Sequence, residues 1–327
     1  MPKKKKPFGI AYVLNGEGGA NKCVPARLSD LMAEKKPTWV HLNISDSRAI
    51  RWLKKQPELN EWVLENLTNT DISDPRMRVK QNRLLLVLRT VNITPRSEPD
   101  DLVFLRLFVT EHFLISVSLS PAIDFSDIDD LFEDNDGPET INELVPALLE
   151  NSLDSVAVSI ERIEDLVDDF EEKIITGKPA EGTYQALSEH LRQVIVIRRF
   201  MMPERDVLDG LIRHRIRWFN AETERSIRDD FDRVRRIVED IDLLEKRIRV
   251  NQDALSHIED KQTQRNTYML SVIAGIFLPL SFIASVFGMN LGGIPLNEQS
   301  YGFLTINLMM IFIGFVIWFL FKKLKWV

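Results

Sequence analysis

The sequence predicts a mixed α/β domain at the N-terminus, then a long α-helical stalk and two C-terminal transmembrane helices. Strand-like segments are confined to about the first 140 residues, and helical patterns follow from Ile141 onward. No charged residue occurs from Thr267 until Glu298, and none again until Lys322. Each of these uncharged, largely apolar runs is long enough to span a bilayer. The expected divisions are a cytoplasmic α/β domain (1–140), a helical hairpin region (141–220), a stalk continuing into the first span (221–290), an external loop (291–301), the second span (302–321) and a basic cytoplasmic tail (322–327).

Short apolar runs predict the strands of the first domain. "TWVHLNI" (38–44) alternates with period two, and "RLLLVLRTVNI" (83–93) is rich in Leu and Val. "DLVFLRLFVT" (101–110) and "HFLISVSL" (112–119) are separated by one residue, which predicts a tight hairpin. The helical pattern of "SRAIRWLKKQ" (47–56) between strands indicates a small α/β domain.

Motifs of catalysis are missing from the sequence. "NGEGGAN" (15–21) looks like a glycine-rich phosphate loop, but it lacks a third spaced glycine and a following Lys-Ser or Lys-Thr pair. It therefore favours a hairpin turn. Without HExxH, GxSxG or a complete P-loop, we expect no enzyme, no prosthetic group and no nucleic-acid partner; the alternative is unconventional chemistry in the α/β domain. The single cysteine, Cys23, excludes a disulfide scaffold and a Cys-based zinc site.

A pair of charged helices is expected after the α/β domain. "SIERIEDLVDDFEEKII" (159–175) carries one apolar stripe, "TGKPAEG" breaks it, and a second helix runs from about Thr183 to Met202. The outer face of this helical hairpin is acidic. We interpret it as a solvated surface, with collection of divalent cations near a pore as the alternative.

The stalk is predicted to be one uninterrupted helix. Asn220 can cap its start, and neither Gly nor Pro follows until Gly275. At 1.5 Å per residue, Ala221 to Asn266 would extend roughly 70 Å. The near-heptad spacing of its apolar residues calls for packing against other helices. These residues are Ile227, Phe231, Val234, Val238, Ile241, Leu244 and Ile248.

Basic residues predict the topology. Lys261 and Arg265 precede the first span, a lysine-rich tail follows the second, and the loop between them has no basic residue. By the positive-inside rule, the N- and C-termini are both cytoplasmic.

One face of the upper stalk and first span is small or polar, whereas bulky apolar residues occupy the other faces. This contrast predicts a water-filled path, with Leu278 as its apolar constriction; the alternative is a small-residue packing seam between helices. The expected pore-lining residues are Thr267, Ser271, Ala274, Leu278, Ser281 and Ser285.

A pore needs several copies of the chain, because one helical hairpin cannot enclose a channel. Asn290, beside Gly288 at the end of the first span, would then form a ring of amides at the outer mouth. Such a ring can accept hydrogen bonds from the water shell of a cation that dehydrates reluctantly. Glu298 is the only acidic residue of the outer loop.

A further candidate site lies below the membrane. Asp253, His257 and Asp260 are spaced four and three residues apart and share one helix face. Repeated around a symmetric stalk, they would form rings that hold Zn²⁺ weakly and respond to pH through the imidazole. The alternative is a solvated stalk surface.

Several motifs now show a resemblance. Gly288-Met289-Asn290 closing the first of two C-terminal spans, with the basic ending "KKLKW", resembles the CorA family of divalent metal-ion transporters. "GMNLGGIP", "PRMRVKQNRLLLVLRTVN" and "RRFMMPERDVL" are similar to its zinc-transporting branch, ZntB.

The resemblance implies a funnel-shaped homopentamer in the lipid bilayer of the cell inner membrane. It implies transport of Zn²⁺ and related ions (Mg²⁺, Co²⁺, Ni²⁺, Cd²⁺), with uptake linked to a proton gradient. The selectivity signature falls on Gly288, Met289 and Asn290, and a basic ring falls on Lys322, Lys323 and Lys325.

The two spans contain no Asp, Glu, His, Cys, Lys or Arg before Lys322. Zinc prefers Cys, His or carboxylate ligands, so we expect it to pass hydrated or to meet ligands only outside the bilayer. Any titrating group for proton coupling would be Glu298 or the Asp253–His257–Asp260 face. The alternatives are an Mg²⁺/Co²⁺ channel of the same family and a membrane-anchored scaffold without flux.

Overall fold

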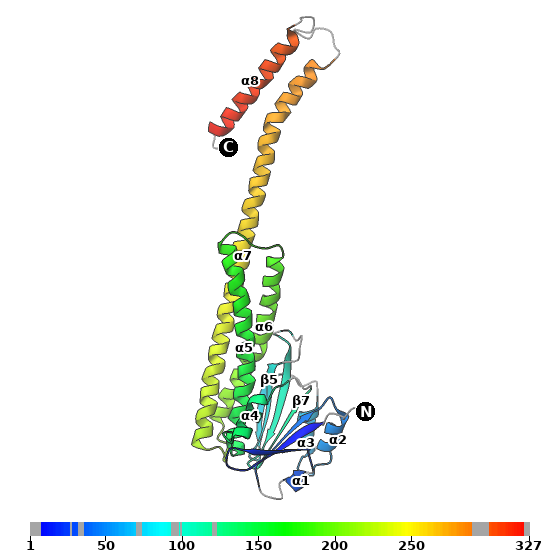
Figure 1. The fold of residues 1–327 in the computed structure, drawn as a ribbon, viewed down its shortest axis with the longest axis vertical. Coiled ribbons are helices and arrows are strands. Elements are labelled where there is room, and N and C mark those ends of the chain that lie inside the picture. Colours follow the sequence, from blue (N-terminus) through cyan, green and yellow to red (C-terminus); the bar gives the residue numbers. More distant parts are fainter. Residues whose placement is uncertain are drawn as a thin grey trace. The chain divides into compact units, whose positions relative to one another are not determined.

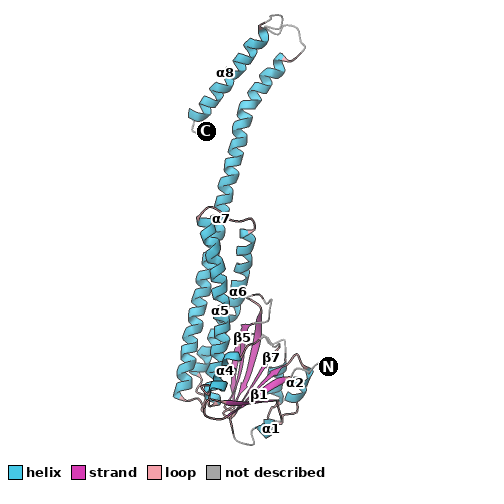
Figure 2. Cartoon of the chain, viewed as in Figure 1, coloured by secondary structure: helices cyan, strands magenta, loops and turns pink. Residues whose placement is uncertain are grey.

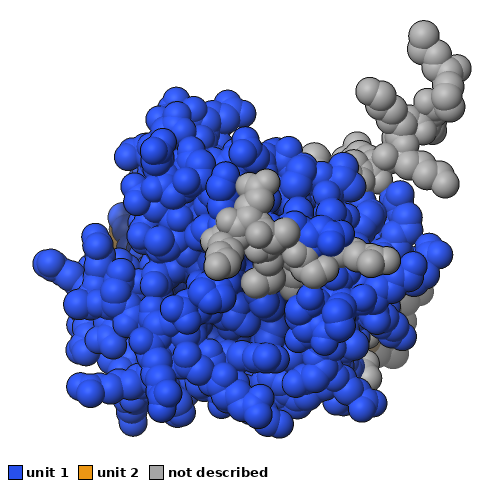
Figure 3. Space-filling model, turned by 90° about the horizontal axis from the view of Figure 1, so that it is seen from below, with its two compact units in different colours: residues 1–252 blue, residues 253–327 orange. Residues whose placement is uncertain are grey.

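The structure is a computed structural model of the 327-residue chain. It describes residues 8–26, 28–31, 36–69, 74–92, 98, 100–119, 123–289 and 301–323. The chain divides into two compact units, residues 1–252 and 253–327, which are treated separately below. Figure 3 shows the surface of the first unit in blue.

The first unit contains a mixed β-sheet, and its strand order is β2-β1-β3-β7-β6-β5-β4 (Figure 2). β3 and β7 are parallel, and every other neighbouring pair is antiparallel. β6 and β7 form the hairpin that the sequence predicted. The strands are β1 (Gly9–Leu14), β2 (Ala20–Cys23), β3 (Thr38–Asn43), β4 (Arg76–Lys80), β5 (Arg83–Val91), β6 (Leu102–Val109) and β7 (Phe113–Ser118).

The glycine-rich segment after β1 is a hairpin turn, as predicted. The Asn15 side chain accepts hydrogen bonds from the backbone N–H groups of Glu17 and Gly19, and Gly16 and Gly18 both have φ of 81°. Glycine suits these left-handed positions because it has no Cβ. The segment reverses the chain between β1 and β2.

Short helices cover one face of the sheet: α2 (Ser47–Leu53) and α3 (Glu61–Thr68). Their apolar residues form a core with alternate residues of the strands, among them Ala49, Val63, Leu85 and Phe108. Arg106 of β6 is fully buried on this face and donates hydrogen bonds from Nη1 to the Asn66 and Leu67 carbonyls, at 3.2 Å each. A cation suits this place because the carbonyl end of a helix is electronegative. Two shorter helices, α1 (Leu28–Leu31) and α4 (Ser126–Asp134), lie in the connecting segments.

Two long helices, α5 (Ile141–Ile175) and α6 (Thr183–Arg213), pack on the sheet at β5 and at β4 and β5, respectively (Figure 1). The prediction that the second helix stops near Met202 is wrong, because α6 continues through Pro203. Proline removes only one hydrogen bond of the helix, and buried residues beyond it hold the next turns in place. These residues are Val207, Leu208 and Leu211.

The stalk helix α7 (Ala221–Phe287) begins where the sequence predicted. The Asn220 side chain accepts a hydrogen bond from Thr223 N–H at 2.7 Å. Within the first unit, the near-heptad residues of α7 are buried, except for half-buried Phe231. Their partners are the helices of the same chain. Arg233 and Arg247 of α7 pair with Asp154 and Asp168 of α5, and Asp242 pairs with Arg198 of α6.

The expected boundaries at residues 140 and 220 fall between α4 and α5 and between α6 and α7. The division of the chain into the predicted domains itself stays a prediction.

Candidate ion-conduction site

The second unit contains the C-terminal part of α7 and α8 (Gly302–Lys323). Both helices have a segment that is long and apolar enough to cross a membrane, judged by length and composition. Large apolar side chains such as Phe303 and Phe312 are exposed, at 83% and 67% of their surface. Exposed apolar surface of this extent is typical of lipid-facing helices.

One face of α7 packs against α8. A Cβ on Gly275 would lie 2.8 Å from Cζ of Phe321, and a Cβ on Gly314 of α8 would lie 3.7 Å from Cδ1 of Leu280. The half-buried residues of this part of α7 recur with helical spacing and define the contact face: Val272, Gly275, Ile276, Pro279, Leu280, Ile283, Val286 and Phe287.

The six predicted pore-lining residues lie on the other side of α7. Each of them is exposed, and Leu278 exposes 69% of its surface. At ~100° per residue, the centre of this stripe lies roughly 150° around the helix from the centre of the contact face. α8 therefore leaves the predicted pore stripe uncovered. Phe277 and Phe282, on intermediate faces, are also exposed, at 65% and 71%.

Three polar side chains of the two apolar helices, Ser271, Thr305 and Asn307, bond to their own backbone. The Ser271 hydroxyl donates to the Thr267 carbonyl at 2.9 Å. In α8, Thr305 donates to Tyr301 O at 3.0 Å and Asn307 donates to Phe303 O at 2.9 Å. The interior of each helix thus satisfies these groups without a second helix.

The end of α7 carries the first two residues of the predicted selectivity signature. Gly288 N–H donates to the Ala284 carbonyl at 2.9 Å, and Met289 is 48% exposed. Asn290 and Glu298, the other predicted residues of the outer mouth, lie outside the described residues.

Two of the three predicted basic residues are described at the end of α8. Lys322 Nζ lies 5.2 Å from the centre of the Trp318 ring, a cation–π contact, and Lys323 is exposed. Lys325 lies outside the described residues.

Asp253, His257 and Asp260 are exposed on a common face of α7. Within one chain, the described residues contain no group of three or more His, Cys, Asp or Glu side chains placed to hold a metal ion. A metal site at this face would therefore need side chains from neighbouring copies, and it stays a prediction.

The structure adds a buried acid that the sequence analysis did not single out. Asp230 of α7 is 7% exposed and lines a cleft of about 320 Å³ between α5 and α7. Burial raises its pKa to about 7; nearby Glu150, Asp229 and Asp154 raise it too, against Arg233. Among the described residues, its Oδ2 has no hydrogen-bond partner. The signal was present in the sequence, because Asp230 stands at helical spacing between Ile227 and Val234.

A second buried acid lies between α6 and the sheet. Glu204 is 1% exposed, and burial raises its pKa to about 8 despite a hydrogen bond at 3.3 Å from Arg89 N–H. Near neutral pH this carboxyl is therefore mostly protonated. Its position among Met201, Val207 and Leu208 was the available sequence signal.

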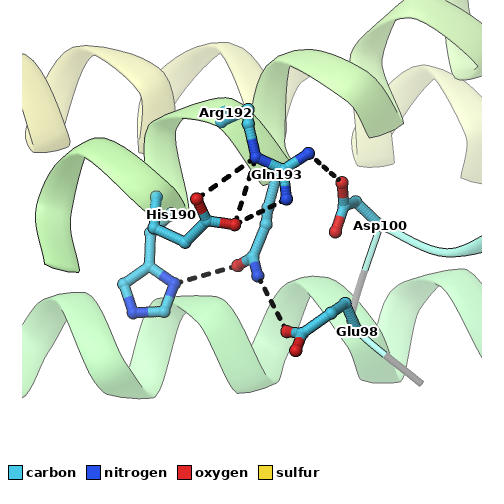
Figure 4. Close-up of polar contacts among 6 residues, drawn as sticks. Glu98, Asp100, His190, Arg192 and Gln193 are labelled. Carbon is cyan, nitrogen blue, oxygen red and sulfur yellow. Dashed lines mark hydrogen bonds and ion pairs between the residues drawn. The ribbon is translucent and has the colours of Figure 1, made fainter. Parts of the chain in front are cut away.

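A polar cluster joins α6 to the segment before β6 (Figure 4). Gln193 is its buried centre: its Oε1 lies 2.9 Å from His190 Nδ1, and its Nε2 donates to Glu98 at 3.3 Å. Arg192 pairs with Asp100 at 2.9 Å. These contacts hold α6 against the segment before β6, and the polar side chains of the cluster are hydrogen-bonded to one another.

Comparison with known proteins gives a consistent family. The sequence model of the family described as "CorA-like Mg2+ transporter protein" matches residues 34–323. The chain is 30% identical over 318 residues to the "Zinc transport protein ZntB" of Pectobacterium carotovorum, covering 97% of this chain and 95% of that protein. It is 31% identical over 317 residues to the "Divalent cation transporter CmaX" of Pseudomonas aeruginosa, covering 96% and 95%.

Solved structures agree in fold. The full-length CmaX protein matches with a TM-score of 0.82 at 30% identity, covering 99% of this chain and 100% of that one. The CorA magnesium transporter of Methanocaldococcus jannaschii also matches with a TM-score of 0.82, at 15% identity, covering 98% and 99%. The resemblance predicted from the signature and the two apolar helices is confirmed: the chain belongs to the CorA family of transporters.

Proposed function

We propose that the chain is a Zn²⁺ transporter that works as a homopentamer in the cell inner membrane. Its central pore is lined by the α7 stripe, from Thr267 to Ser285, and Asn290 forms the ring at the outer mouth. The observation that carries this proposal is the orientation of the stripe. It faces away from α8, on a side that is open to contact with further copies of the chain.

Zinc is proposed on the strength of the relatives' names and the length of the match. ZntB of Klebsiella pneumoniae is 33% identical over 322 residues, covering 97% of this chain. Because the apolar segments offer no zinc ligand, the ion crosses hydrated, with Mg²⁺, Co²⁺, Ni²⁺ and Cd²⁺ as further permeant ions. Both termini lie in the cytoplasm, and Lys322, Lys323 and Lys325 surround the inner end of the pore.

The second candidate is an Mg²⁺/Co²⁺ channel of the same family. It is favoured by the absence of zinc ligands from the spans and by the magnesium named in the family description. An amide ring that holds a hydrated ion suits Mg²⁺, which dehydrates reluctantly.

Flux into proteoliposomes tests the proposal. The full-length chain is reconstituted into liposomes that contain a zinc-selective or a magnesium-selective dye. Influx of each ion is measured with and without an inward proton gradient. We expect saturable Zn²⁺ influx that exceeds Mg²⁺ influx and rises with the gradient. Mg²⁺ influx without Zn²⁺ influx would select the second candidate, and no flux of either ion would leave a membrane-anchored scaffold.

A further inference from the structure

Two basic segments that are far apart in the sequence meet on the surface of the first unit. "RMRVKQNR" (76–83) forms β4 and the turn into β5, and it has four basic residues and no acid. "RHRIR" (213–217) spans the end of α6 and adds three arginines and a histidine. The charge is local, because residues 1–266 together have more acidic than basic side chains.

Specific contacts hold the two segments together. The turn residue Asn82 accepts a hydrogen bond at Oδ1 from Arg217 N–H at 3.1 Å, and its carbonyl accepts one from Trp218 Nε1 at 2.9 Å. Gly210 brings α6 close to β4, since a Cβ there would lie 2.7 Å from Met77 Sδ. The fold therefore fixes the relative positions of the two backbone segments that carry these positive charges.

A groove lies where the two segments meet, which we name the β4 groove. Its volume is about 530 Å³, within the range of roughly 300–1,000 Å³ typical of small-molecule sites. The groove wraps around the edge strand: Arg78 and Lys80 lie on the face that α3 covers, beside Trp62, whereas Met77 and Val79 lie on the face that α6 covers. It is lined by Trp62, Met77, Arg78, Val79, Lys80, Gly210 and His214.

Arg78 and Lys80, the basic residues of the groove, are available to bind an anion. Lys80 Nζ lies 5.7 Å from the centre of the Trp62 ring, and Arg78 has no ion pair among the described residues. Elsewhere in the unit, exposed arginines commonly pair with carboxylates, as Arg192 does with Asp100. Arg78 and Lys80 also guard the open edge of β4 against pairing with another strand. That protective role does not require an indole beside Lys80.

We propose that the β4 groove binds a nucleoside polyphosphate. Arg78 and Lys80 contact the phosphates, because guanidinium and ammonium groups are the usual partners of phosphate oxygens. The base packs on Trp62 once the Lys80 ammonium turns from the ring to the phosphates, since an indole face stacks on any base. The indole beside Arg78 and Lys80 is what makes a nucleotide a better fit than a bare phosphate. All of the residues that line the groove belong to the first unit.

Binding of a fluorescent N-methylanthraniloyl ATP tests the proposal. Anisotropy is recorded with the full-length chain in detergent, with EDTA present so that metal binding does not contribute. We expect saturable binding with a dissociation constant below about 1 mM and competition by ATP. The double variant Arg78→Gln/Lys80→Gln should weaken binding about tenfold or more. Trp62→Leu should weaken ATP binding while leaving the weak competition by pyrophosphate unchanged.

A matched control removes two positive charges from a different part of the surface, outside the β4 groove. Arg235→Gln/Arg249→Gln changes two exposed arginines of α7 that pair within their own helix, so it should bind as the unchanged chain does. Thermal unfolding of each variant verifies its fold. Absence of saturable binding, or an equal loss in the control, would overturn the site. Pyrophosphate or vesicles containing phosphatidylglycerol competing as well as ATP would overturn the assignment to a nucleotide.

Discussion

Gly275 of α7 lies against the ring of Phe321 in α8, so close that a Cβ on the glycine would come within 2.8 Å of Cζ. Small residues at such contacts let two membrane helices approach. We predict that Gly275→Ala destabilises the pair of helices by ~1 kcal/mol through overpacking, seen as a lower midpoint of thermal unfolding in detergent. Gly314→Ala is the matched control, because its Cβ would have ordinary contact with Leu280 at 3.7 Å. Equal midpoints for both variants would contradict the contact, and Phe321→Leu should restore the Gly275→Ala protein.

Thiol labelling tests which face of α7 meets water. In a Cys23→Ser background, cysteines at Ser271, Ser281 and Ser285 should react at least about tenfold faster with a charged aqueous reagent than cysteines at Leu280 and Ile283. The reason is that the first group lies on the uncovered stripe, whereas the second lies on the half-buried contact face with α8.

Labelling at Phe277 and Phe282 is the decisive comparison, because these residues are exposed in the single chain but lie outside the stripe. Faster reaction there than on the stripe would mean that another face of α7 lines the pore.

Replacing Asn290 tests the outer ring. Asn290→Ala should abolish flux or alter ion preference while the oligomer stays folded, because the proposed ring would lose the amide oxygens that accept hydrogen bonds from the hydrated ion. Asn307→Ala provides the control, since that amide bonds to its own helix at Phe303 O. Normal flux and unchanged preference in Asn290→Ala would remove the residue from the selectivity site.

The exposed face below the apolar segment should bind zinc only in the assembled protein. We predict that His257→Ala with Asp260→Asn lowers Zn²⁺ binding and flattens the pH dependence of flux, because the imidazole loses its metal-binding form on protonation. Zinc binding is measured by calorimetry, and flux is measured between pH 5.5 and 8. Glu259→Gln, on another face of α7, should change neither. The prediction is falsified if the double variant retains both properties.

Stability of the first unit should depend on pH through Asp230. Its folded pKa of about 7 lies above the ordinary value of 3.8. Between these values the unfolded chain loses the proton while the folded chain keeps it, so stability falls as pH rises from about 4 to 7. Above pH 7 Asp230 is ionised in the folded chain as well, and burial of this charge lowers the free energy of unfolding by its full amount. Asp230→Asn should then stabilise the protein by ~2–4 kcal/mol.

Thermal unfolding at pH 5 and pH 8 provides the measurement for Asp230. The gain from Asp230→Asn should appear mainly at pH 8, and Asp229→Asn, at the exposed neighbour, should give a smaller change. An equal gain at both pH values would mean that Asp230 does not titrate in this range.

Much of the fold follows from periodicity and length. The apolar runs of β5, β6 and β7 and the capped, glycine-free start of α7 identify their structures because burial imposes those patterns. The end of α6 was mispredicted at Pro203, since packing of the residues beyond it outweighs the lost hydrogen bond. Short β2 and α1 have too few residues to show a period.

The candidate sites were less accessible from the sequence. Helical spacing places Ser271 and Ser281 on one face, but only the packing of Gly275 on Phe321 shows that α8 covers a different face. The β4 groove could not be predicted from the sequence for the same reason. Arg78 and His214 are more than a hundred residues apart, and no local pattern indicates that both line one groove.

The hydrogen bonds that Ser271, Thr305 and Asn307 make to their own helices have a consequence for biogenesis. A newly made helix in which these side chains already have backbone partners carries fewer unsatisfied polar groups into hydrocarbon. Each apolar segment can therefore leave the insertion machinery as a separate helix, before it meets α8, α7 or another subunit. In the proposed pentamer, assembly would then proceed laterally within the bilayer, and a subunit without its neighbours would be an inserted monomer rather than an aggregate.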